Sequence, residues 1–258
     1  MHRRGILLID RGSREPEVKE ELSELCSMTR IRGNYHHSTY SMLEVTRPYI
    51  EDGISECKNA DVEYLTIVPY FLYPGLKMKS AVIKASRIAK DMNVRFFISR
   101  SLNYHPNLLR LVMDRIDEAK KRDGVDVRDS ECDVLLVGHG SSDINARRTF
   151  NRVAHALSAH YRSVNVCFLE LDRPDIREGI LSRMNSSTLI IMPYFLHNGT
   201  HMKNEVKDTI EETIEYARNR YGFRGRAIIT GHLGVSPLIS DAIIDRAREV
   251  ERSLASSR

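Results

Sequence analysis

The chain has 258 residues, of which 41% are hydrophobic and 29% charged, and its formal net charge is +4. This is the composition of a folded globular protein, with length for one large α/β domain or two domains of roughly 130 residues each. The mild positive charge permits an acidic small-molecule ligand but does not indicate nucleic acid, and no apolar run approaches the roughly 20 residues that span a bilayer. We therefore expect a cytoplasmic monomer with neither a nucleic-acid nor a membrane partner. None of the cysteines forms a C-x-x-C pair, which indicates reduced core thiols at Cys26, Cys57, Cys132 and Cys167.

Short apolar runs alternate with helical patterns along the chain. The first part predicts strands at Gly5–Ile9, His37–Leu43, Tyr64–Pro69 and Val94–Ser99, and helices at Glu15–Met28, Pro48–Lys58, Lys77–Met92 and Pro106–Lys121. A charged stretch at residues 120–130 has no helical apolar period and predicts a linker. Beyond it, strands are predicted at Val134–Val137, Val164–Leu169, Thr188–Met192 and Arg226–Thr230, with helices between them and a last helix from Pro237. Strands that alternate with helices predict an α/β fold with parallel sheets.

The two parts of the chain are copies of one unit. Residues 43–54 (LEVTRPYIEDGI) align with residues 169–180 (LELDRPDIREGI), with seven of twelve positions identical. Residues 69–79 and 193–203 align with seven of eleven identical. This internal duplication predicts two similar βα-repeat domains, at residues 1–123 and 131–258. Domain interfaces favour ligand sites, so we expect an active-site cleft between the two.

Three residues of the second repeat follow successive predicted strands. His139 lies in Gly138-His139-Gly140, which directly follows an apolar strand, and Ser141 and Asp143 then provide N-cap residues for the next helix. Glu170 and His201 follow the next two strands.

The carboxyl ends of parallel strands share one rim, where ligands bind in open α/β sheets, so these three side chains can converge. Two imidazoles and a carboxylate suit a transition-metal ion with open coordination positions, and they also suit proton transfer near neutral pH.

These motifs resemble the sirohydrochlorin chelatases, which are class II chelatases related to the bilobed ferrochelatase fold. The resemblance rests on GHGS after a strand, FLE followed by P-x-I, and PYFL-x-x-G-x-H, which occur in the family's order. It implies a chelatase of the lyase class that inserts Co²⁺ or Fe²⁺, and possibly Ni²⁺, into sirohydrochlorin for cobalamin or siroheme biosynthesis, with no organic cofactor. It also implies that His139 and His201 are metal ligands and that Glu170 is a ligand or a proton acceptor.

The first repeat departs from this pattern. Arg11, Glu44 and Lys77 stand where the second repeat has His139, Glu170 and His201. We therefore expect a degenerate metal site in the first repeat. Two cations could bind the carboxylates of sirohydrochlorin, so Arg11, Lys77 and Glu44 are candidate substrate-binding residues, and drift after loss of the histidines is the alternative. Because Glu44 persists without histidine partners, a structural task for Glu170 also stays open.

The sequence also allows other functions and further candidate residues. A non-catalytic tetrapyrrole or metal carrier could use the same site, whereas a nucleotide-binding protein is disfavoured because neither repeat has G-x-G-x-x-G or G-x-x-x-x-G-K-[ST] after its first strand. Tyr70 and Tyr194 could stack on a flat macrocycle or pack in the core. The remaining minor candidates are the rim or loop residues His105, His197 and His232, together with Arg147 and Arg148 in the first turns of a helix, where either a solvated face or anion binding is open.

Overall fold

The computed structural model describes residues 3–197, 199 and 205–255. The first repeat contains, in chain order, β1 (Arg4–Asp10), α1 (Pro16–Gly33), β2 (His37–Met42), α2 (Ile50–Asn59), β3 (Tyr64–Pro69), α3 (Leu76–Asp91), β4 (Phe96–Ile98) and α4 (Pro106–Arg122). A 3₁₀ turn, η1 (Asp129–Glu131), precedes β5 (Asp133–Gly138), α5 (Ile144–Leu157), β6 (Ser163–Phe168), α6 (Ile176–Leu181), β7 (Thr188–Pro193), α7 (Lys207–Tyr221), β8 (Arg226–Ile229) and α8 (Pro237–Ala255).

Each repeat forms one four-stranded parallel sheet. The strand orders are β2-β1-β3-β4 and β6-β5-β7-β8, so the two sheets have the same topology. The central strands are buried on both faces, as their continuous apolar runs predict: Ile6 to Ile9 in β1 and Val134 to Val137 in β5 are at most 1% exposed. The predicted α/β class, the parallel sheets and the duplication are confirmed.

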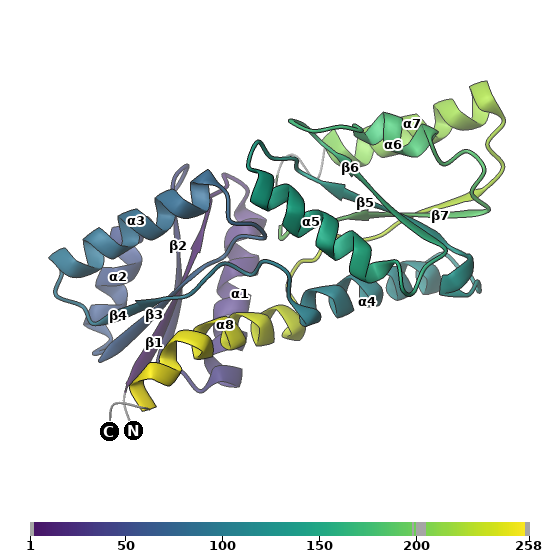
Figure 1. The fold of residues 1–258 in the computed structure, drawn as a ribbon. Coiled ribbons are helices and arrows are strands. Elements are labelled where there is room, and N and C mark those ends of the chain that lie inside the picture. Colours follow the sequence, from purple (N-terminus) through teal and green to yellow (C-terminus); the bar gives the residue numbers. More distant parts are fainter. Residues whose placement is uncertain (1–2, 198, 200–204, 256–258) are drawn as a thin grey trace. The chain divides into compact units, whose positions relative to one another are not determined.

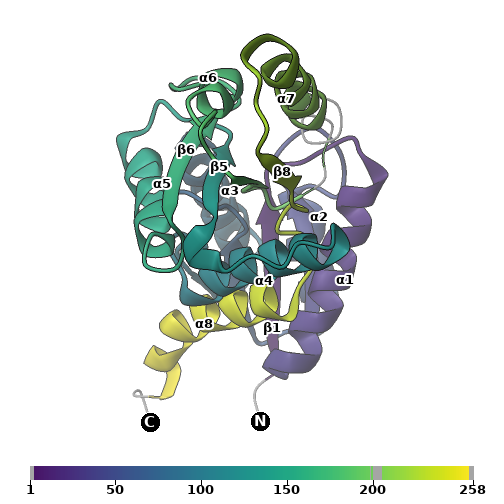
Figure 2. The same cartoon turned by 90° about the vertical axis from the view of Figure 1, so that its right-hand side faces the viewer.

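The chain divides into two compact units: unit 1 comprises residues 1–107 and 235–258, and unit 2 comprises residues 108–234. In unit 1, α2 and α3 cover one face of the sheet, and α1 and α8 lie on the other (Figure 1). In unit 2, α6 and α7 cover one face, with α5 and α4 on the other (Figures 1 and 2). The compact units therefore have other boundaries than the sequence repeats, because each repeat's last helix belongs to the other repeat's sheet.

Polar contacts hold both of these helices in place. The carboxylate of Glu251 in α8 is nearly buried and accepts hydrogen bonds from Arg4, Tyr35 and Thr66 of unit 1. In unit 2, the Arg115 guanidinium of α4 donates to the carbonyl oxygens of His232 and Leu233.

Most helix and strand positions match the predicted ones to within two residues, but α1 ends at Gly33 instead of Met28, and two further elements differ. The predicted linker is wrong over its first residues, since Lys120 to Arg122 continue α4 and residues 129–131 form η1. The ammonium of Lys120 donates to Oδ1 of Asp129 at 2.8 Å, which joins the end of α4 to η1. β4 is shorter than expected, at Phe96–Ile98 instead of Val94–Ser99. No helix in the described part of the chain is both long and apolar enough to cross a membrane.

Candidate active site

The candidate site lies at the carboxyl edge of the unit 2 sheet. His139 directly follows β5 and Glu170 follows β6, its hydrogen-bonded neighbour. In this sheet β6 lies on one side of β5, and the following strand β7 lies on the other side. His139 therefore stands at the point where the strand order reverses. In open α/β sheets this switch point is the usual place for a ligand.

His139 and Glu170 face each other. Nδ1 of His139 lies 3.2 Å from Oε1 of Glu170, and the two side chains are 31% and 54% exposed. A carboxylate at this distance favours the tautomer with the proton on Nδ1, which leaves the lone pair of Nε2 for a metal ion. The convergence of these two residues agrees with the expectation from the sequence.

The backbone around the pair is held from several sides. The amide of Glu170 donates to the carbonyl of His139 at 3.0 Å, so the two site residues share a backbone hydrogen bond. Gly140 has φ 92°, and a Cβ there would lie 1.7 Å from the carbonyl oxygen of Glu170. Only glycine fits this position, because the turn after β5 and the turn after β6 press together there.

Asp172 is a site-supporting residue that sequence reasoning missed. Its side chain is 9% exposed and accepts hydrogen bonds from the Ser141 amide at 2.9 Å and from Arg147 at 3.2 Å. It thereby joins the loop after β5 to the loop after β6. Its position in the LELDRP motif, where the first repeat has Thr46, was the available signal. The predicted helix cap is confirmed, since Asp143 accepts from the Asn145 amide and Ser141 from the Asp143 amide.

The third expected ligand, His201, lies outside the described residues, so its place relative to the pair stays a prediction. Among the residues that the structure describes, no group of three or more His, Cys, Asp or Glu side chains could hold a metal ion. Cysteine ligands are disfavoured, because all four thiols are buried and burial raises the pKa of Cys26, Cys57 and Cys167 to about 12.

The matching turns of unit 1 hold an ion triad. Nζ of Lys77 donates to Oε2 of Glu44 at 2.6 Å, and Nε of Arg11 lies 3.6 Å from Oε1 of the same carboxylate. The hydrogen bond from Lys77, followed by the charges of Lys77 and Arg11, lowers the pKa of Glu44. The local backbone matches that of unit 2, with a Gly12 φ of 110° and the Glu44 amide bonded to the Arg11 carbonyl. Two cations thus surround the carboxylate at the position where unit 2 has His139 beside Glu170.

Three of the minor candidates, Tyr70, Tyr194 and His105, are buried residues with structural contacts. Tyr70 and Tyr194 are 2% and 1% exposed, and Tyr194 packs against Phe150 at 5.7 Å between ring centroids, so the core alternative holds for both. His105 is buried, and its Nδ1 accepts from the Asn107 amide at the start of α4. Burial lowers the pKa of His105.

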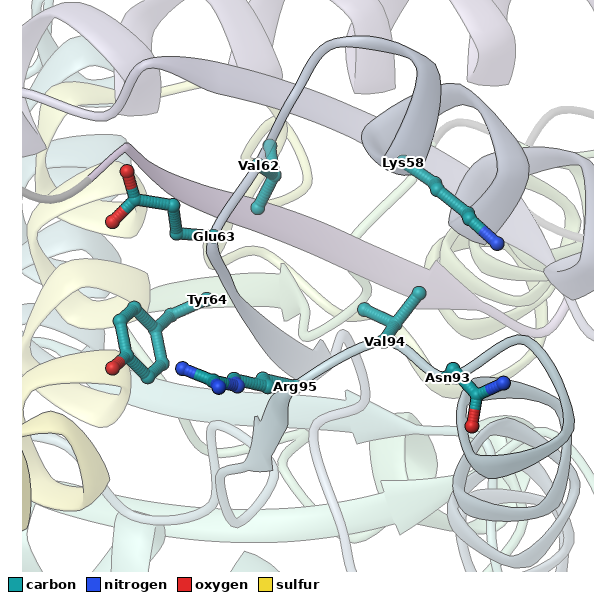
Figure 3. A pocket seen from close by; sticks show the side chains of 7 residues that line it. All are labelled: Lys58, Val62, Glu63, Tyr64, Asn93, Val94 and Arg95. Atoms are coloured by element: carbon teal, nitrogen blue, oxygen red, sulfur yellow. The ribbon is translucent and has the colours of Figure 1, made fainter.

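A pocket of about 440 Å³ lies elsewhere in unit 1 (Figure 3). Its walls come from the end of α2 and from the segments at the amino ends of β3 and β4: Lys58, Val62, Glu63, Tyr64, Asn93, Val94 and Arg95. Arg11, Glu44 and Lys77 follow the carboxyl ends, so the pocket is separate from the chemistry of the rim.

The doubly wound fold, its duplication and the His–Glu pair at the switch point define a chelatase-like α/β protein. The model of the CbiX family matches residues 5–119 and 133–250, so this chain belongs to the CbiX family.

Curated relatives match nearly the whole chain. A sirohydrochlorin cobaltochelatase of Priestia megaterium is 24% identical over 256 residues, covering 95% of this chain and 79% of the relative. A sirohydrochlorin ferrochelatase of Bacillus subtilis is 24% identical over 253 residues, covering 96% and 92%. Among solved structures, SirB from Bacillus subtilis with Fe³⁺ has a TM-score of 0.82 at 23% identity, covering 99% of this chain and 98% of that one. The structural likeness shows that the fold is shared.

Proposed function

We propose that this chain is a sirohydrochlorin chelatase that inserts a divalent metal ion into the tetrapyrrole, with Co²⁺ as the first candidate and Fe²⁺ as the second. The observation that carries the proposal is the 3.2 Å His139–Glu170 pair at the switch point of a CbiX-family sheet. Relatives named sirohydrochlorin cobaltochelatase and ferrochelatase support it, as does a SirB structure in complex with cobalt.

The chemistry asks for groups that hold the ion and accept protons. Insertion removes two N–H protons from the pyrrole rings while the metal enters from one face. In our proposal Nε2 of His139 and the imidazole of His201 bind the metal substrate, and imidazole suits Co²⁺, Fe²⁺ and Ni²⁺. Glu170 binds the ion or accepts a pyrrole proton, since its half-exposed carboxylate can pass a proton on to solvent.

The unit 1 triad is proposed to bind substrate carboxylates. Glu44 neutralises only part of the charge of Arg11 and Lys77, so the triad keeps a net positive charge in a half-exposed position. A cationic group of this kind attracts the carboxylates of sirohydrochlorin and repels a second metal ion.

The test is direct. The protein is mixed with sirohydrochlorin and Co²⁺, Fe²⁺ or Ni²⁺ separately, and the absorption spectrum is followed. His139→Ala and His201→Ala should each slow insertion by orders of magnitude, and Glu170→Gln should slow it without changing the thermal midpoint. Binding of sirohydrochlorin without acceleration of insertion by any metal would identify a carrier and reject the enzyme.

A further inference from the structure

Leu171, the residue after Glu170, has two unfavourable features at once. Its φ is 64°, in the left-handed region that disfavours L-residues with bulky side chains. Its side chain is also 69% exposed, so its apolar surface faces water. Backbone strain of this kind persists where surrounding structure enforces it, and it gathers at functional sites.

The first repeat has the same feature at the same place. Val45 follows Glu44 with a φ of 78° and is 47% exposed. A β-branched residue with positive φ is a genuine outlier, and glycine or asparagine would fit either turn with less strain. Each repeat thus has a bulky apolar residue directly after the glutamate that the two repeats share.

Hydrogen bonds fix these turns. Next to Leu171, the Asp172 amide donates to the Glu170 carbonyl at 2.8 Å, and next to Val45 the Thr46 amide donates to the Glu44 carbonyl at 3.0 Å. The strained residue is therefore held with its side chain outside the core.

Other exposed apolar side chains gather at the same edge of each sheet. Eight large hydrophobic side chains are exposed within the described part of the chain, and four of them follow carboxyl strand ends: Val45, Leu76, Ile144 and Leu171. A single exposed apolar residue is ordinary, but this grouping on the rim that holds the charged site residues indicates an apolar ligand surface.

We propose that Leu171 is a substrate-binding residue whose side chain packs against the apolar ring system of the tetrapyrrole beside the metal site. The inference rests on the proposed function and deepens it, since it names a residue beside Glu170 for the apolar ring of that substrate. Contact with the ring removes Leu171 from water, which offsets the unfavourable exposure.

Two substitutions separate the side chain from the strain. Leu171→Ala removes most of the apolar surface and keeps the strained backbone, whereas Leu171→Asn keeps much of the size and tolerates positive φ. Ile83→Ala is the matched control, because Ile83 in α3 is 70% exposed and lies away from the rim. Affinity is measured by absorption titration of metal-free sirohydrochlorin, and Co²⁺ affinity is measured separately by calorimetry without tetrapyrrole.

Both Leu171 variants should bind metal-free sirohydrochlorin roughly tenfold more weakly, with wild-type Co²⁺ affinity and a thermal midpoint at or above wild type for Leu171→Asn. Ile83→Ala should bind like wild type. Unchanged tetrapyrrole affinity in both Leu171 variants overturns the inference while the proposed function stands. Loss of Co²⁺ affinity in Leu171→Asn also overturns it, since Leu171 would then shape the Glu170 turn. Wild-type protein that binds no sirohydrochlorin would instead reject the proposed function itself.

Discussion

Replacing Glu251 tests whether α8 is an integral part of unit 1. Its carboxylate accepts from Thr66 at 2.7 Å, from Tyr35 at 3.0 Å and from Arg4 at 2.7 Å, so one residue of α8 satisfies donors on or near three strands. Thr66 and Tyr35 are 1% and 4% exposed, so neither hydroxyl can turn to solvent when the acceptor is lost.

The expected loss follows from these contacts. A hydrogen bond to a charged group contributes about 1.5–3 kcal/mol, and the Glu251 carboxylate is the acceptor in all three bonds. We use the lower end for each bond, and for Arg4 in particular because its side chain is 30% exposed and solvent screens part of the attraction. Glu251→Ala should therefore lower the free energy of unfolding by about 4 kcal/mol, and Glu251→Gln by about 2 kcal/mol, since the amide keeps one acceptor oxygen.

The assay is urea unfolding of the full chain followed by circular dichroism, with Asp241→Ala as the control. Asp241 also lies in α8 and pairs with Arg32 of α1, but both side chains are exposed, so its loss should cost at most about 1 kcal/mol. A Glu251→Ala protein no less stable than Asp241→Ala would refute the reasoning.

Two further predictions concern charge. If the unit 1 triad binds substrate carboxylates, Arg11→Ala and Lys77→Ala should raise KM more than they lower kcat in steady-state kinetics. The KM of the wild type should also rise with salt more steeply than the KM of the double variant. A double variant with the KM and the salt dependence of the wild type would show that Arg11 and Lys77 arose by drift. Hydrogen bonds from Arg162, then Ser186 and Ser163, lower the pKa of the buried Asp133. A lowered folded-state pKa gives stability that is present above the unfolded value of about 4 and is lost progressively as the pH falls through the lower folded-state value, so the thermal midpoints of wild type and Asp133→Asn should differ by a constant amount above about pH 5 and approach each other as the pH falls from about 4 toward 2. A gap that stays constant over that range would contradict this role.

The sequence predicts the elements well because local signals specify them. The runs Ile6–Ile9 and Val134–Val137 are buried strands as expected, and the LE-x-x-RP repeat puts Glu44 and Glu170 in matching turns. His139 and Glu170 meet because neighbouring parallel strands bring their carboxyl ends together.

Long-range contacts and unusual backbone conformations could not be predicted from the sequence. The placement of α8 in unit 1 depends on contacts such as that of Glu251 with Thr66, which are 185 residues apart in the chain. Leucine prefers a negative φ, but Leu171 has a positive φ because the hydrogen bonds of the whole turn enforce it. The interdomain cleft and the place of His201 stay predictions.

The exchange of last helices also sets the order in which the molecule can be completed during synthesis. Domains fold as units while the chain leaves the ribosome, amino-terminal parts usually first. Here every residue of unit 2 has been made by position 234, whereas unit 1 must wait for residues 237–255. Until then, the hydroxyls of Thr66 and Tyr35 and the sheet face beneath α8 lack their cover. Unit 1, which contains the first strands of the chain, is thus the last to finish folding. A nascent chain that ends before α8 would contain one complete unit and one sheet with an uncovered face, which chaperones or proteases can bind.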